Sequence, residues 1–188
     1  MRVPLSAVLA VSLTLAPIPE TGKAHVLGAE APPASCARPD ASAATQAVPA
    51  GLVDALLVWI GAATGYDVAP SRAAPPEIAF CATGDWIDYE DSKVLVDEHL
   101  RAVYDWPGRR VLLVAPWDAD DLRDRSILLH ELIHQVQLAN RDWPCLQAPE
   151  WEAYKLQERW LNEHGIDPEF DWLQIYFLSR CPRDIHPD

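Results

Sequence analysis

The chain has 188 residues, which is enough for one domain with a hydrophobic core and short for two. Hydrophobic residues make up 49% of the chain and charged residues 23%, which argues against a wholly disordered or collagen-like protein. Acidic residues (28) outnumber lysine and arginine (15), giving a formal net charge of −13 without any basic run. This balance disfavours nucleic-acid binding and electrostatic attachment to an anionic membrane.

The N-terminus has the layout of a secretory signal peptide. Arg2 precedes an apolar run over residues 3–16, and the first acidic residue is Glu20. The run is short for a transmembrane helix, and small residues suited to cleavage occur near residues 24 and 29. We assign residues 1–29 to the signal peptide and expect an exported protein, periplasmic or secreted. Cleavage would leave no stable membrane span; an uncleaved anchor is the alternative.

The chain has four cysteines, an even number that suits export to a compartment where disulfides persist. No two of them have a Cys-x-x-Cys spacing, which argues against a cysteine zinc site or a redox motif. Three pairings are open. We favour Cys145–Cys181 and Cys36–Cys81, because each bond would join neighbouring parts of the chain.

Residues 30–50 are rich in Ala, Pro and Ser and are predicted to be a loosely packed lead-in to a domain over residues 51–188. Apolar residues recur at helical spacing from Leu52 to Ile60, and Gly65 is a plausible helix end. After the Pro-Pro pair at 75–76, residues 77–80 are a short strand candidate.

Two strands, residues 102–105 and 109–114, are predicted to form a hairpin around Trp106-Pro107-Gly108. Aspartates over residues 118–121 can cap the next helix, which carries a long apolar pattern from Ile127 to Leu138. A further helix is expected over about residues 149–161. Asp167-Pro168-Glu169 is predicted to open the last helix, which continues through Phe177.

The motif that indicates chemistry is His-Glu-Leu-Ile-His at residues 130–134. On a helix, His130 and His134 share one face and can provide two ligands of a zinc ion. Glu131 lies about 100° round the helix from His130, where it can act as general base without binding the metal. The surrounding helix is strongly apolar and therefore expected to be buried, and buried polar side chains need partners.

A catalytic zinc usually has three protein ligands, and no histidine follows the pair closely. Glu150 and Glu152, on the next helix, are the candidates. They lie about 200° apart round the axis, so they cannot both face the metal. We favour Glu150, because it shares a face with Ala153, whose small side chain lets the two helices approach; the face of Glu152 is expected to be largely solvated.

These motifs resemble the gluzincin group of zinc metallopeptidases, in which HExxH is followed by a helix with a ligand in a Glu-x-x-Ala pattern. Here that reads His130-Glu131-Leu132-Ile133-His134, then Glu150-Trp151-Glu152-Ala153. The chain is also similar to a family of small exported bacterial HExxH proteins. The resemblance implies a minimal zincin core with a bound Zn²⁺. The Asn-Glu-x-x-x-Asp form of the ligand helix is absent, so partners of the metal ligands are not identified from sequence.

We therefore expect an α+β fold, with helices packed on a small, mostly antiparallel sheet and the HExxH helix buried. The cleft is expected along the strand Arg109–Val114, taken as the sheet edge, where a peptide could add as an extra strand. The expected function is zinc-dependent cleavage of a peptide or protein substrate; the alternative is a non-catalytic exported metal-binding or interaction module. Candidates to stabilise an oxyanion are Tyr154, Tyr176 and His164.

Overall fold

The computed structural model describes residues 36, 47–89 and 92–182. The described residues all belong to one compact unit of the chain. The predicted signal peptide lies outside the described residues, as does most of the Ala/Pro-rich lead-in. Within the described part, no helix is both long and apolar enough to cross a membrane.

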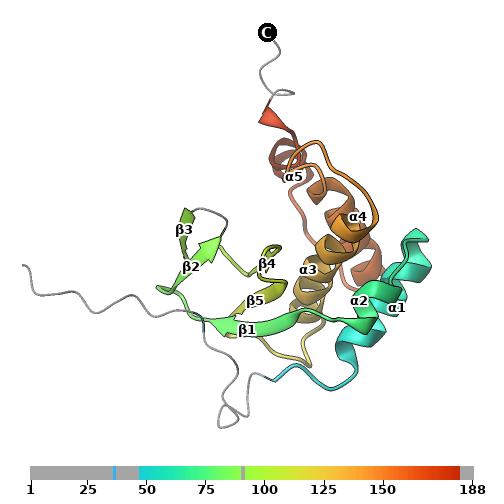
Figure 1. Ribbon diagram of the computed structural model, residues 1–188, viewed down its shortest axis with the longest axis horizontal. Coiled ribbons are helices and arrows are strands. Elements are labelled where there is room, and N and C mark those ends of the chain that lie inside the picture. Colours follow the sequence, from blue (N-terminus) through green and yellow to red (C-terminus); the bar gives the residue numbers. More distant parts are fainter. Residues whose placement is uncertain (1–35, 37–46, 90–91, 183–188) are drawn as a thin grey trace, which may run out of the picture. The chain divides into compact units, whose positions relative to one another are not determined.

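The described residues form an α+β structure, as predicted, and comprise five helices and two small sheets (Figure 1). The first helix, α1 (Leu52–Thr64), buries Leu56, Leu57 and Ile60 and ends at Gly65. Gly65 has a φ of 77°, a left-handed conformation that glycine adopts at little cost, and its N–H bonds the carbonyl of Gly61. The short helix α2 (Ala69–Ala73) follows and was not predicted.

The larger sheet has the strand order β1–β5–β4, with β1 (Glu77–Cys81), β4 (Ala102–Asp105) and β5 (Arg110–Val114). The predicted β4–β5 hairpin is confirmed as an antiparallel pair, whereas β1 pairs with β5 in parallel. The strand assigned to the sheet edge in the sequence analysis is therefore central. β5 has partners on both sides, so the cleft expected along it lies instead beside β4, which pairs only with β5 among the described strands.

Alternate residues of β5 point to two different cores. Val111 and Leu113 pack with the helices, whereas Leu112 and Val114 pack on the opposite face of the sheet. That opposite face is covered by the hairpin of β2 (Trp86–Tyr89) and β3 (Ser92–Leu95), which the sequence analysis did not predict. A strand buried on both faces has an apolar run without alternation, and this accounts for the sequence RRVLLV.

The central helix is α3 (Leu122–Asn140), which contacts α1, α2, α4, β4 and β5 (Figure 1). Its N-terminus is capped as expected, because the Asp121 carboxylate accepts a hydrogen bond from the Arg123 N–H. Leu128, Leu129, Leu132, Ile133 and Val136 are fully buried. The helix is thus enclosed on most of its circumference, and its polar side chains have to find partners inside the protein.

The last two helices are α4 (Glu150–Glu163) and α5 (Trp172–Leu178). Ala153 is fully buried where α4 packs on α3, as expected for a small residue at a close approach. The predicted start of α5 at Asp167 is wrong. Glu169 has a left-handed φ of 55°, and the helix begins after Asp171, whose carboxylate accepts hydrogen bonds from the N–H groups of Leu173 and Gln174.

Both favoured disulfides are present. Cys36 bonds Cys81 at the end of β1, and Cys145 bonds Cys181. The second bond joins the loop before α4 to the segment after α5 at a sequence separation of 36, so the loop that it closes includes both helices. Closing a loop of this length restricts the unfolded chain and therefore stabilises the folded state in which α4 and α5 are packed.

Candidate metal centre

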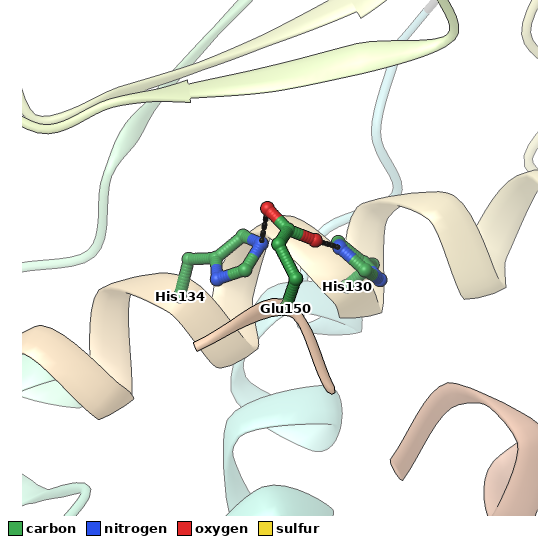
Figure 2. Close-up of side chains that lie close together, drawn as sticks. All are labelled: His130, His134 and Glu150. Carbon is green, nitrogen blue, oxygen red and sulfur yellow. Dashed lines mark hydrogen bonds and ion pairs between the residues drawn. The ribbon is translucent and has the colours of Figure 1, made fainter. Parts of the chain in front are cut away.

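The carboxylate of Glu150 lies between the two histidines of α3 (Figure 2). One oxygen, Oε2, is 3.2 Å from His130 Nε2, and the other, Oε1, is 3.3 Å from His134 Nε2. These ligand atoms all lie within 4.8 Å of one another, so the three residues could hold a metal ion. Of the two glutamates considered in sequence, Glu150 is thus the one that the structure brings to the histidines.

The chain reaches this geometry through two ordinary helix features. His130 and His134 are one turn apart on α3, and their rings are in edge-to-face contact with centroids 4.7 Å apart. Glu150 is the first residue of α4, directly after the buried Pro149. Because the close packing at Ala153 brings α4 against α3, the first turn of α4 faces the histidine pair.

Burial and charge act in opposite directions on the ionisable groups of the site. Burial raises the pKa of Glu150, but hydrogen bonds and attraction from the two histidines outweigh it and hold the pKa far below the usual glutamate range. Burial lowers the pKa of His134, yet its hydrogen bond to Glu150 and the negative charge there raise it overall. The Glu150 carboxylate therefore faces positive charge, and a bound cation would provide the same charge pattern.

Glu131, the expected general base, is 7% exposed and does not belong to the group of potential ligands. Burial raises its pKa above the ordinary glutamate value, while the positive charge of the histidines and a hydrogen bond from the backbone N–H of Tyr104 oppose the rise. Tyr104 belongs to β4, so the Glu131 side chain connects α3 to the edge strand β4. A carboxylate with a raised pKa takes up a proton more readily than an ordinary glutamate, which is what a general base has to do.

The site opens into a cavity of about 280 Å³ between α3, β4 and the start of α4. Besides the three potential ligands and Glu131, its walls are mainly apolar and include Trp106, Leu138 and Leu146. A second cavity of about 310 Å³ shares His130, Glu131 and Tyr154 and extends toward the first turns of α3, where Arg101 and Phe170 line it. His130 thus lines both cavities, whereas His134 and Glu150 line only the first.

Of the three candidates for oxyanion stabilisation, only Tyr154 lines these cavities. Its ring packs edge-on against His130 with centroids 4.5 Å apart, and burial together with the charges of Glu150 and Glu131 raises its pKa to about 12. Its hydroxyl is therefore a neutral donor at physiological pH. Tyr176 instead accepts a hydrogen bond from Arg180. His164 is at the end of α4, where its Nδ1 is 2.7 Å from the carbonyl oxygen of Trp160.

Glu152 has a different environment from the one expected. Its face of α4 was expected to be largely solvated, but Glu152 is half-buried and accepts a hydrogen bond from Gln137 Nε2 at 2.8 Å. The hydroxyl of Tyr66 donates to the same carboxylate. The assignment of helix faces from the sequence missed these contacts, because Tyr66 follows α1 and is brought to α4 only by the tertiary fold.

Two glutamines that sequence reasoning missed contact the histidines. Gln137 Oε1 is 3.0 Å from His134 Nδ1, and Gln157 Oε1 is 3.0 Å from His130 Nδ1. The available signal was positional: Gln137 is three residues after His134, and Gln157 lies seven residues, or two helical turns, after Glu150. A glutamine about one or two helical turns from a potential ligand, on the buried side of its helix, is a candidate partner for a ligand.

The chain belongs to a family described as a domain of unknown function (DUF6647), whose model matches residues 44–188. No curated protein and no solved structure matches the chain significantly. All residues of the candidate metal centre, and the glutamines that contact it, lie within the domain of this family.

Proposed function

We propose that this protein is a zinc-dependent metallopeptidase. The observation that carries the proposal is the convergence of His130 Nε2, His134 Nε2 and the Glu150 carboxylate within 4.8 Å, with Glu131 directly beside them. Two imidazoles and one carboxylate form a common protein ligand set of catalytic zinc, which leaves one position open for water or substrate. The resemblance of the two motifs to those of gluzincins supports the same reading.

The donor set fits a zinc ion in its chemistry as well as its spacing. Each Nδ1 already has a glutamine partner, so each Nε2 is available to a ligand on its other side. Both Nε2 atoms are close to the Glu150 carboxylate, and such a contact is favourable only if a proton or a cation lies between the nitrogen and the oxygen. A zinc ion, when bound, supplies Lewis-acid chemistry by acidifying water and polarising a carbonyl oxygen.

The residues of the chain provide the remaining steps of hydrolysis. The Glu131 carboxylate takes a proton from the attacking water and transfers it to the nitrogen of the leaving amine as the C–N bond breaks. The Tyr154 hydroxyl, which is neutral because its pKa is raised to about 12, donates a hydrogen bond to the carbonyl oxygen as negative charge develops there. The Tyr104 N–H on the outer edge of β4 already donates to Glu131, so the edge amide available to align a peptide backbone is that of Ala102.

The cleft walls favour a peptide with an apolar side chain next to the scissile bond. Trp106, Leu138 and Leu146 surround the cavity on the His134 side of the site, and the charged residues among its lining are those of the catalytic group itself. A charged substrate side chain entering there would lose water without gaining a partner. The substrate is therefore a peptide or protein that presents an apolar residue at this position.

The proposal includes export from the cytoplasm. The signal-like N-terminus supports it, and so do the two disulfides, which are rare in cytosolic proteins. The substrate would then be a peptide or protein outside the cytoplasm.

The test combines metal content with cleavage of a random peptide library. Purified protein should contain about one zinc per chain and cut library peptides, with apolar residues enriched on one side of the cut. Glu131→Gln provides the matched control, because it should keep the zinc and lose the cleavage. Bound zinc without cleavage in either protein would favour the alternative, a non-catalytic metal-binding module; absence of zinc uptake would exclude both.

A further inference from the structure

Each ligand histidine has a buried glutamine on the side away from Glu150. Gln137 is fully buried and Gln157 is 6% exposed, and in both the amide oxygen is 3.0 Å from an imidazole Nδ1. An amide presents an acceptor at one end and two donors at the other, so its orientation decides which imidazole nitrogen carries a proton. The partners at the far end of each amide determine that orientation.

For Gln137, the far end is fixed by two groups that only accept hydrogen bonds. Its Nε2 donates to the Glu152 carboxylate at 2.8 Å and to the carbonyl oxygen of Pro149 at 3.1 Å. A reversed amide would place its oxygen against both acceptors, in a fully buried position where the repulsion could not be relieved by water. The Gln137 oxygen must therefore face His134, and His134 Nδ1 must be the donor of that hydrogen bond.

For Gln157, the orientation is fixed through one further residue. The Ser126 hydroxyl donates its only proton to the carbonyl oxygen of Arg123 at 2.7 Å, so its oxygen is left as an acceptor. Gln157 Nε2 donates to this oxygen at 3.0 Å. The Gln157 oxygen must then face His130, and His130 Nδ1 must be the donor. Each of these chains of hydrogen bonds, here called a relay, has different partners at its far end. Both place the proton of the imidazole on Nδ1.

We propose that Gln137 and Gln157 are positioning residues that fix both ligand histidines with the proton on Nδ1 and the Nε2 lone pair directed at the metal position. Two additional residues, Glu152 and Tyr66, hold the Gln137 relay through their contacts with one another and with the amide. This inference rests on the metal centre of the proposed function and assigns roles to residues outside its ligand set. Gln137 and Gln157 are neutral amides, so they add no negative charge to the histidines. Within the ligand group, the negative charge comes from Glu150.

The first test measures zinc affinity of the full protein by competition with a chelator. Gln157→Met keeps the length of the side chain but removes the acceptor, and it should weaken zinc binding about 10–100-fold, the usual effect of removing such a partner. Gln157→Glu restores an acceptor to Nδ1, and the Ser126 hydroxyl can turn its proton toward the new carboxylate. This variant should bind zinc at least as tightly as the wild type.

Gln135→Met is the matched control, because Gln135 is a further buried glutamine, on α3, and the only hydrogen bond of its amide among the described residues goes to the Ala74 carbonyl oxygen. It should keep wild-type zinc affinity. The midpoint of unfolding is measured for each variant, so that a loss of affinity is compared between equally folded proteins.

The second test needs no variant. In zinc-loaded wild-type protein, ¹⁵N NMR of the imidazoles should show the proton on Nδ1 of both His130 and His134. Protons on Nε2, wild-type affinity in Gln157→Met, or an equal loss in Gln135→Met would each overturn the positioning role while leaving the zinc centre intact. Failure of the wild-type protein to take up zinc would instead overturn the proposed function together with this inference.

Discussion

Glu150 and Glu152 lie two residues apart at the start of α4, and their carboxylates face different partners. Glu150 contacts His130 and His134, whereas Glu152 accepts a hydrogen bond from Gln137 on the far side of His134. Glu150 is thus a potential metal ligand. Glu152 is one residue further from the candidate metal position and holds Gln137, the partner of the potential ligand His134.

We expect Glu150→Ala to abolish tight zinc binding, because it removes the charged ligand, and Glu152→Ala to weaken binding about 10–100-fold by loosening Gln137. Chelator competition on both variants measures the difference. If Glu152→Ala lost the metal and Glu150→Ala retained it, the ligand assignment would be wrong even though a metal centre remained.

Glu131→Gln should retain the zinc and the fold and lose hydrolysis by a factor of about 10²–10⁴ or more, the range found when a general base is removed. The amide has the size of the carboxylate but cannot take a proton. Elemental analysis and peptide cleavage on the same sample provide the two readouts. A variant that lost its metal, or that cleaved at the wild-type rate, would show that Glu131 has a different role.

Zinc affinity should rise with pH, and the rise should continue to pH values above the ordinary histidine pKa. Glu150 raises the pKa of His134 in the metal-free protein, so this imidazole keeps its proton to a higher pH and zinc must displace it. Acidification below this range therefore favours the proton and releases metal. Titrations of zinc affinity between about pH 5 and pH 8 check the direction; a flat profile would contradict it.

Tyr154→Phe should lower kcat by about 10²–10³-fold with zinc content unchanged, because it removes one hydrogen-bond donor from the carbonyl oxygen. Tyr176→Phe is the control: its hydroxyl contacts Arg180, and its ring packs on Trp151 away from the two site cavities. Equal activity in the two variants would exclude Tyr154 as the donor.

The exported protein should lack its N-terminus and contain both disulfides. Intact-mass analysis of material recovered outside the cytoplasm should show cleavage near residue 24 or 29 and a mass four hydrogens below that of the reduced form. A full-length protein with four titratable thiols would contradict the export assignment.

Local features of the sequence were sufficient to predict the helices that carry the site. The HExxH pattern on an apolar helix placed both histidines on one face, and the small side chain of Ala153 selected the face of α4 that contains Glu150. Both are properties of residues one helical turn or less apart, where geometry follows directly from the helix repeat.

The features that sequence did not reveal depend on partners distant in the chain. The pattern of RRVLLV shows a buried strand but not that β1 is its parallel neighbour, so the sheet edge was assigned to β5 instead of β4. Likewise, the burial of Glu152 requires Tyr66, which is 86 residues away. Neither contact is visible in the sequence as a repeating residue pattern. The chain between the two partners is so long that it does not restrict how they lie relative to one another.

The edge of β4 has a consequence for the timing of amide exchange. Because Val114 N–H bonds the carbonyl of Arg101, the alternation of an antiparallel ladder directs the amides of Ala102 and Tyr104 away from β5. Amides of β5 have strands on both sides and should be the last in this sheet to exchange with deuterium, whereas β4 exchanges earlier. A peptide that pairs with β4 would slow deuterium exchange on that strand alone. The exchange rate of the β5 amides would stay unchanged and provides an internal reference for peptide binding.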